Sequence, residues 1–236
     1  MVKGPVTTSP FSAWIRVLRP GNLLIIAASI AVLRWSYSNH IPESGEYFLE
    51  ILFILPLVLL AAGGNIINDY FDIKEDRVNK PERALVGRVL KRRIALVSHW
   101  GLSAAGLIIA GILSVKINTS IPFIIALIIA IVLFLYSTKF KGSVLVGNVI
   151  VACAVASVVP FAYADSIDTS PPLFQALSLF IWEFGNLTGV IFLIVFIRKL
   201  VKDIEDLDGD RKAGHATLPI TYSPQASWRL INTLLI

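Results

Sequence analysis

The sequence has few of the residues from which many soluble enzymes build their sites. Of its 236 residues, one is a cysteine and three are histidines, and only 16% are charged. The single cysteine, Cys153, excludes a disulfide within the chain and any metal centre built from several cysteines. An average soluble domain carries about 25% charged residues. Since 56% of this chain is hydrophobic, the sequence indicates a membrane protein.

Long apolar runs are what the sequence has instead. A helix needs about 20 consecutive apolar residues to cross a bilayer. We predict six membrane spans, at roughly 14–35, 48–67, 94–115, 121–137, 144–164 and 173–197. The last apolar stretch, 226–236, is too short to cross and is expected to begin a seventh helix. The predicted fold is an all-α polytopic membrane helix bundle, forming one domain over 1–236 that is incomplete at its C-terminus.

The positive charge is distributed unevenly between the two sides of these spans. Most of the 21 lysines and arginines fall on one side, and only Arg34 and Lys116 are expected on the other. The positive-inside rule therefore places the N-terminus and two long loops, 68–93 and 198–224, in the cytoplasm. We expect a multi-pass protein of the cell's inner membrane with no cleaved signal peptide. Topology explains the basic excess, so no nucleic-acid partner is expected.

The first long loop opens with the acidic segment "NDYFDIKED". Asn68, Asp72 and Asp76 are spaced four residues apart. On a continuing helix this spacing places all three on one face.

The second long loop opens with a similar segment, "DIEDLDGD". Asp203, Asp206 and Asp210 are spaced by three and then four residues, which again gives one helix face. Gly209 and Gly214 predict that the helix ends or bends at those positions.

These acidic faces have two interpretations, a solvated helix end or a cation site. Carboxylates near a helix C-terminus oppose the helix dipole, and like charges on one face repel each other. A bound cation relieves both effects. Oxygen ligands without histidine or cysteine select a hard ion, which predicts Mg²⁺ as the cofactor. Because Mg²⁺ is commonly held by one or two carboxylates and substrate phosphates, the two faces indicate a diphosphate substrate.

Basic residues close to the two segments are candidates for binding such a polyanion. Their alternative role is ordinary positive-inside charge and attraction to lipid headgroups. Arg19 is the strongest candidate, because it lies just inside the first span beside Asn22, and ionisable groups at that depth usually face the bundle interior. The other basic candidates are Arg77, Lys80, Arg83, Lys139 and Lys141.

The two segments also carry a resemblance to a known family. "NDYFDIKED" and "DIEDLDGD" resemble the paired Asp-rich motifs of the UbiA superfamily of intramembrane prenyltransferases, and "YSTKFKG" is similar to its Tyr/Lys motif. "LRPGNLL" resembles the opening segment of that family. The resemblance implies nine transmembrane helices around a cavity and an isoprenyl diphosphate bound through Mg²⁺.

Residue roles follow from the same resemblance. It implies that Asp72, Asp76, Asp206 and Asp210 are the catalytic residues. The implied metal ligands are Asn68, Asp72, Asp76, Asp206 and Asp210, with Asp203 at a less decisive position. Tyr136 joins Arg19, Asn22 and the basic residues named above as an implied substrate-binding residue.

The acceptor is expected to be lipid-soluble. The segments around "YSTKFKG" and "GDRKAGHATLPI" most resemble the branch that alkylates geranylgeranylglyceryl phosphate to make ether lipids. Prenylation of an aromatic quinone precursor is the alternative within the family. A membrane transporter with a cytoplasmic cation site is an alternative of another class. Transporters usually bind their ions near the bilayer midplane, whereas these acids lie at the membrane edge, which favours the enzyme.

Overall fold

The computed structural model describes residues 9–38, 46–73, 76–77, 84–167 and 173–235. The described chain is helical, as predicted, and its elements run in the following order. They are α1 (Pro10–Leu18), α2 (Pro20–Ser38), α3 (Tyr47–Phe71), α5 (Arg92–Lys116), α6 (Ile121–Leu135), the π-helix η1 (Tyr136–Phe140), α7 (Val146–Ala156), α8 (Val158–Ala162), α9 (Leu173–Glu205), α10 (Leu207–Ala213), α11 (Leu218–Thr221) and α12 (Pro224–Leu234). The prediction of one domain over 1–236 stays a prediction.

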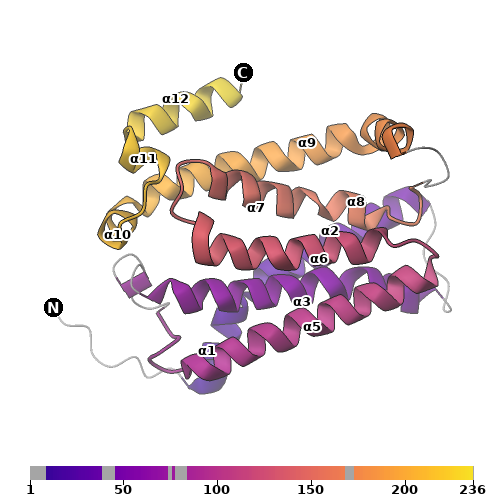
Figure 1. The fold of residues 1–236 in the computed structure, drawn as a ribbon, viewed down its shortest axis with the longest axis horizontal. Helices are drawn as coiled ribbons and strands as arrows, with labels where there is room; N and C mark the ends of the chain where they lie inside the picture. Colours follow the sequence, from indigo (N-terminus) through magenta and orange to yellow (C-terminus); the bar gives the residue numbers. More distant parts are fainter. Residues whose placement is uncertain (1–8, 39–45, 74–75, 78–83, 168–172, 236) are drawn as a thin grey trace.

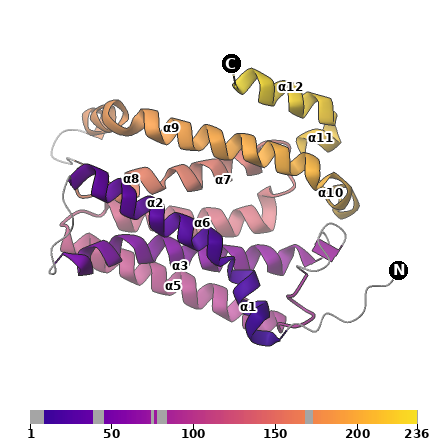
Figure 2. The same ribbon diagram turned by 180° about the vertical axis from the view of Figure 1, so that it is seen from behind.

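The long helices lie side by side as a bundle (Figure 1). Helices α3 and α5 form one layer, α6 and α7 the next, and α9 the outermost, with α12 running back along α9. Seen from behind, α2 crosses the bundle obliquely (Figure 2). Small residues allow α3 and α5 to pack closely: a Cβ on Gly106 would lie 3.0 Å from the Pro56 carbonyl oxygen.

The prediction of six complete spans is only partly correct. Within the described residues, four helical segments are long and apolar enough to cross a membrane: Tyr47–Phe71, Arg92–Lys116, Ile121–Phe140 and Ile181–Glu205. The bent pair α1 and α2 gives a fifth if it is counted as one span. The predicted span 144–164 is shorter, since α7 and α8 together cover 146–162 and break at Ser157. Pro160 accounts for the break, because proline cannot donate a hydrogen bond to the Ala156 carbonyl.

The first predicted span bends at Arg19. This residue has φ 56°, in the left-handed region, and its backbone N–H bonds to the Arg16 carbonyl, which ends α1. The axes of α1 and α2 differ by 41°. Pro20 then opens α2 at a position where its missing N–H costs nothing. The bend matters because it lets the Arg19 side chain leave the line of the helix and reach α3.

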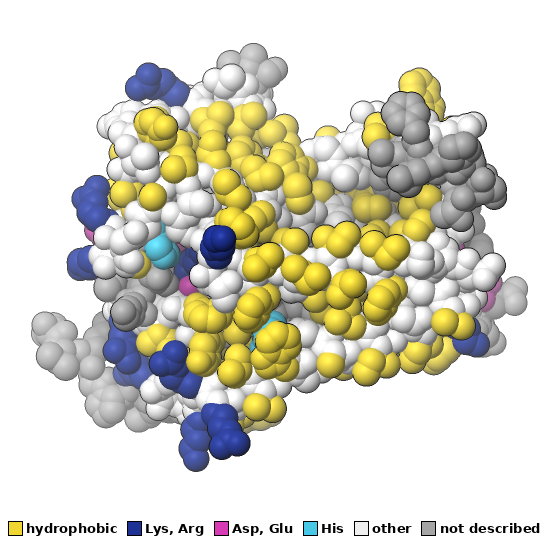
Figure 3. Space-filling view, viewed as in Figure 1, with side chains coloured by type: hydrophobic (Ala, Val, Ile, Leu, Met, Phe, Trp, Pro, Cys, Tyr) yellow, Lys and Arg dark blue, Asp and Glu magenta, His cyan; other side chains and the backbone are white. Residues whose placement is uncertain are grey.

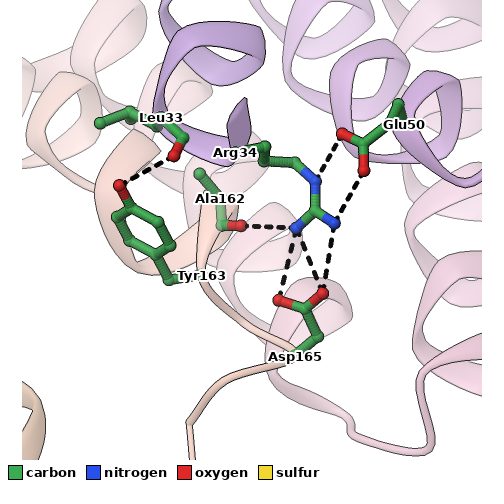
Figure 4. Close-up of polar contacts among 6 residues, drawn as sticks. All are labelled: Leu33, Arg34, Glu50, Ala162, Tyr163 and Asp165. Atoms are coloured by element: carbon green, nitrogen blue, oxygen red, sulfur yellow. Dashed lines mark hydrogen bonds and ion pairs between the residues drawn. The ribbon is translucent and has the colours of Figure 1, made fainter. Parts of the chain in front are cut away.

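The other end of the bundle is tied together by Arg34 of α2 (Figure 4). Its guanidinium donates to Glu50 of α3 at 2.6 and 2.9 Å, to the Ala162 carbonyl at 2.9 Å and to Asp165 at 3.2 Å. It also lies over the Phe53 ring, 3.5 Å from the centroid. One side chain therefore links α2, α3 and the turn after α8.

The surface matches a protein embedded in a bilayer. Hydrophobic side chains cover the middle of the face in Figure 3, while most lysines and arginines on it gather at the end where α10 lies. Many large apolar residues are exposed, among them Leu24, Ile108, Ile128 and Val190. Cys153 is also exposed, on α7.

Cysteine labelling tests the orientation. In a Cys153→Ser background, we expect Arg88→Cys and Ala213→Cys to react with a membrane-impermeant thiol reagent from the cytoplasmic side. Ser166→Cys should react only from the opposite side, because the charge bias places its turn there. Reaction of Ala213→Cys and Ser166→Cys from the same side would contradict the arrangement of the spans.

Candidate active site

The first acidic segment forms the end of α3. Hydrogen bonds of the helical type continue beyond the helix, from the Asp72 N–H to the Asn68 carbonyl at 2.9 Å and from the Asp76 N–H to the Asp72 carbonyl at 2.8 Å. The Asn68 amide also donates to the Asp72 carboxylate. These two hydrogen bonds support the predicted spacing of the three residues, and the carboxylate of Asp72 is buried while that of Asp76 is half-buried.

Asp69 also belongs to this end of the bundle, although the sequence argument gave it no definite role. It is buried and forms an ion pair with Arg19. Its charge is repelled by Asp76 and attracted by Lys141. No pattern in the sequence links Arg19 to Asp69, because the two are 50 residues apart and meet only through the bend at Arg19.

The second acidic segment spans the end of α9 and the first part of α10. Asp203 lies in α9, Asp206 occupies the junction, and Asp210 is buried in α10. Gly214, with φ 80°, ends α10 as predicted. Gly209 does not end a helix: it is buried within α10, and the chain breaks at Asp206 instead. Asp203 and Asp210 remain close enough for their charges to repel each other.

A short segment between α6 and α7 contacts the first acidic segment directly and is linked to the second through Lys199. In η1 the Lys141 N–H bonds to the Tyr136 carbonyl at 2.9 Å, five residues back, which is the wider turn of a π-helix. The Lys141 ammonium forms an ion pair with Asp72 of the first motif. The Tyr136 hydroxyl accepts a hydrogen bond from Lys199 at 3.1 Å, and Lys199 lies 3.8 Å from Asp203 of the second motif.

Two buried residues of this network were missed by the sequence argument. Lys199 lies on α9 one turn before Asp203, and Asn148 of α7 donates to the Asp203 carboxylate at 2.8 Å. The available signal was polarity inside an apolar span, because Asn148 interrupts "SVLVGNVIVA". Sequence spacing alone does not tell which motif such a residue meets.

The loop after α10 packs against the same segment. The Ala216 N–H donates to the Gly142 carbonyl at 2.7 Å, and the His215 imidazole lies 3.5 Å from the Asp210 carboxylate. Gly142 is required for this approach, since a Cβ there would lie 2.7 Å from the His215 ring.

Other predicted substrate-binding residues do not join the network. Asn22, Arg77 and Lys139 are exposed, and none of them forms an ion pair or side-chain hydrogen bond with the described acidic residues. Lys139 instead places its ammonium 5.7 Å from the centre of the Phe140 ring. Lys80 and Arg83 lie outside the described residues.

The acidic side chains do not by themselves form a preassembled metal centre. Among the described residues, no three aspartate, glutamate, histidine or cysteine side chains converge closely enough to hold an ion. Basic partners neutralise them instead: Arg19 pairs with Asp69, Lys141 with Asp72 and Lys202 with Asp206. The donor set still suits Mg²⁺, because it consists of oxygen ligands gathered at one end of the bundle.

The sequence profile described as the UbiA prenyltransferase family matches residues 23–236. The chain belongs to this family. It is therefore a transferase of isoprenyl groups and a multi-pass integral membrane protein, and the transporter alternative is set aside. The resemblance seen in the paired acidic motifs is confirmed.

Individual relatives agree with this assignment. The chain is 34% identical over 213 residues to the digeranylgeranylglyceryl phosphate synthase of Thermococcus kodakarensis, covering 89% of this chain and 69% of the relative. It is 37% identical over 209 residues to the enzyme of the same name from Thermococcus gammatolerans, covering 88% and 68%.

Solved structures have the same fold. A structure described as a digeranylgeranylglyceryl phosphate synthase in membranes is 29% identical, with a TM-score of 0.67 over 96% of this chain and 74% of that one. A UbiA homologue from Archaeoglobus fulgidus, bound to GPP and Mg²⁺, has a TM-score of 0.69 at 18% identity, covering 94% and 74%.

Proposed function

We propose that the protein transfers an isoprenyl group from an isoprenyl diphosphate to geranylgeranylglyceryl phosphate, a step of ether-lipid synthesis. One observation carries the proposal: at one end of the bundle, the Tyr136–Lys141 segment pairs with the first acidic motif through Lys141 and is linked through Lys199 to Asp203 of the second motif. A diphosphate at that end would meet carboxylates from two helices and basic side chains between them. The names of the Thermococcus relatives support this choice of acceptor.

Mg²⁺ would be held by the oxygen ligands of the two motifs. We propose Asn68, Asp72, Asp76, Asp203, Asp206 and Asp210 as these ligands. When bound, the ion supplies charge neutralisation for the departing diphosphate. The solved relative from Archaeoglobus fulgidus binds both GPP and Mg²⁺, which supports the cofactor proposal. The ion pairs with Arg19, Lys141 and Lys202 would then be exchanged for contacts with metal and phosphate.

The chain's own residues contribute in two ways. Lys141 and Arg19 would donate to diphosphate oxygens and stabilise the negative charge that develops as the C–O bond breaks. The apolar spans would hold the prenyl tail and keep water from the allylic carbon, which becomes cation-like before the acceptor attacks it. Asn22, Arg77, Lys80, Arg83, Tyr136 and Lys139 remain proposed substrate-binding residues, of which Tyr136 has direct support from its contact with Lys199.

We further propose that the site faces the cytoplasm and that the membrane is the cell's inner membrane. The supporting observation is the crowding of lysines and arginines at the same end of the bundle as the acidic motifs (Figure 3). Both substrates have polar head groups, so they would approach from that side with their chains in the bilayer.

Removal of divalent cations should abolish transfer. The assay uses detergent-solubilised protein, radiolabelled geranylgeranyl diphosphate and a panel of acceptors that includes geranylgeranylglyceryl phosphate and an aromatic quinone precursor. We expect no product in excess EDTA and full recovery when excess Mg²⁺ is restored, because the carboxylate set needs a hard cation to bind diphosphate. Undiminished transfer in EDTA would refute the metal role, and product only from the aromatic acceptor would refute the proposed acceptor.

A further inference from the structure

Lys199 is a buried cation with a loosely held carboxylate partner. Only 9% of the surface of Lys199 is exposed. The ammonium lies 3.8 Å from Asp203, longer than the roughly 2.8 Å of a charge-assisted hydrogen bond. Asp203 instead accepts a hydrogen bond from Asn148 at 2.8 Å. The one hydrogen bond that Lys199 makes among the described residues goes to a neutral group, the Tyr136 hydroxyl, at 3.1 Å.

A second lysine lies close enough for the two charges to repel each other. The Lys141 ammonium pairs with Asp72 and lies on the same segment as Tyr136, which Lys199 contacts, so its charge opposes that of Lys199. It too is mostly buried, with 20% of its side chain exposed. Like charges away from water repel more strongly than on a solvated surface. An anion between them would remove this repulsion and supply the strong acceptor that Lys199 lacks.

The neighbouring tyrosine adds a donor to the same place. Because the Tyr136 oxygen accepts the hydrogen bond from Lys199, its own proton remains available to donate. Two ammonium groups and a hydroxyl together favour a ligand with several acceptor oxygens and more than one negative charge. Phosphate has this chemistry.

We propose that Lys199, with Lys141 and Tyr136, binds a phosphate group of a substrate. On binding, this phosphate replaces Asp203 as the partner of the Lys199 ammonium. This inference deepens the proposed function and rests on it for the identity of the substrate. The phosphate belongs either to the diphosphate of the donor or to the glyceryl phosphate of the acceptor. Once phosphate neutralises Lys199, Asp203 becomes available to a metal ion.

Anion binding can be tested without catalysis. The thermal unfolding midpoint of the detergent-solubilised protein is measured with increasing inorganic phosphate or inorganic pyrophosphate. The test variant is Lys199→Met, which keeps most of the apolar stem. The double variant Lys199→Met/Asp203→Asn guards against a folding failure caused by an uncompensated buried carboxylate. Lys212→Met is the matched control, since it removes an exposed lysine from α10 at the same end of the bundle.

We expect one or both anions to stabilise the wild-type and Lys212→Met proteins. The Lys199→Met variants should need an anion concentration about tenfold higher or more to reach the same rise in the unfolding midpoint, because a hydrogen bond to a charged group is lost. Lys199→Arg should restore part of the effect. If the double variant is stabilised by both anions at wild-type concentrations, or if neither anion stabilises the wild-type protein, the inference is wrong.

Kinetics then identify the source of the phosphate. A rise of about tenfold in the acceptor KM of Lys199→Met, with an unchanged donor KM, would assign the acceptor. The reverse pattern would assign the donor diphosphate. The two proposals can fail separately. If the Lys199 variants lose anion stabilisation but the wild-type protein transfers no prenyl group, the phosphate site stands and the enzyme activity is rejected. If Lys199→Met transfers normally with both KM values unchanged, the enzyme activity stands and the phosphate site is rejected.

Discussion

Asp72→Asn, Asp76→Asn, Asp206→Asn and Asp210→Asn are each expected to slow prenyl transfer about a hundredfold or more, on the order of 3 kcal/mol of lost transition-state stabilisation. Asparagine nearly preserves the shape of aspartate but removes the charge that a metal ion needs. The measurement is initial-rate transfer at saturating Mg²⁺, with folding checked by thermal unfolding in detergent.

The position within the network decides which of these variants is most informative. Asp72 neutralises Lys141, whose side chain is only 20% exposed, so its loss also affects stability. Asp206, with 17% of its side chain exposed, pairs at 3.8 Å with Lys202, whose side chain is 42% exposed, and a long pair with one solvated partner adds less to stability than the Asp72 pair. Asp206→Asn should therefore fold like the wild type and still lose activity.

Asp208→Asn is the matched control for the acidic residues. Asp208 lies two residues after Asp206, in α10, and its side chain is exposed. If the acidic segments were merely solvated helix ends, Asp206→Asn and Asp208→Asn would behave alike, with near-normal rates and unchanged or slightly higher stability. Equal, near-wild-type rates for these two variants would thus remove the case for a site.

Arg34→Met is expected to destabilise the folded bundle by about 2 kcal/mol, which corresponds to a fall of roughly 4–8 °C in the unfolding midpoint. The substitution leaves Glu50 and Asp165 without their shared partner and frees the Ala162 carbonyl (Figure 4). We expect a smaller loss of folding free energy than for a fully buried ion pair, because the Glu50 and Asp165 side chains are 22% and 31% exposed.

Two comparisons make this prediction specific. Lys116→Met removes an exposed cation at the C-terminal end of α5 and should leave the midpoint unchanged. Arg34→Lys should restore only part of the stability, because an ammonium cannot form the forked contacts with Glu50 and Asp165. An unfolding midpoint for Arg34→Met within about 1 °C of wild type would show that the cluster does not hold α2, α3 and α8 together.

Much of the fold was predictable because its signals are local. A helix within a bilayer must satisfy its backbone internally and present apolar side chains to lipid, so long apolar windows located α3, α5, α6 and α9. The places where prediction failed were the breaks. Ser157 shortens the fifth predicted span and Asp206 interrupts the helix that was expected to bend at Gly209. Such breaks depend on single hydrogen bonds that a sliding window averages away.

The candidate site, too, was predictable where its signals are local and not where it depends on packing. Sequence spacing by itself determined that Asn68, Asp72 and Asp76 follow one another on a turning chain, and the charge bias and family motifs indicated that both acidic segments serve one function. Only the tertiary structure decided their partners: Lys141 with Asp72, Arg19 with Asp69, and Lys199 with Asp203 and Tyr136. Helical periodicity is fixed by backbone geometry within a few residues. Contacts such as Asn148 with Asp203, 55 residues apart, depend on how each helix is rotated and where it breaks, which only packing against its neighbours determines.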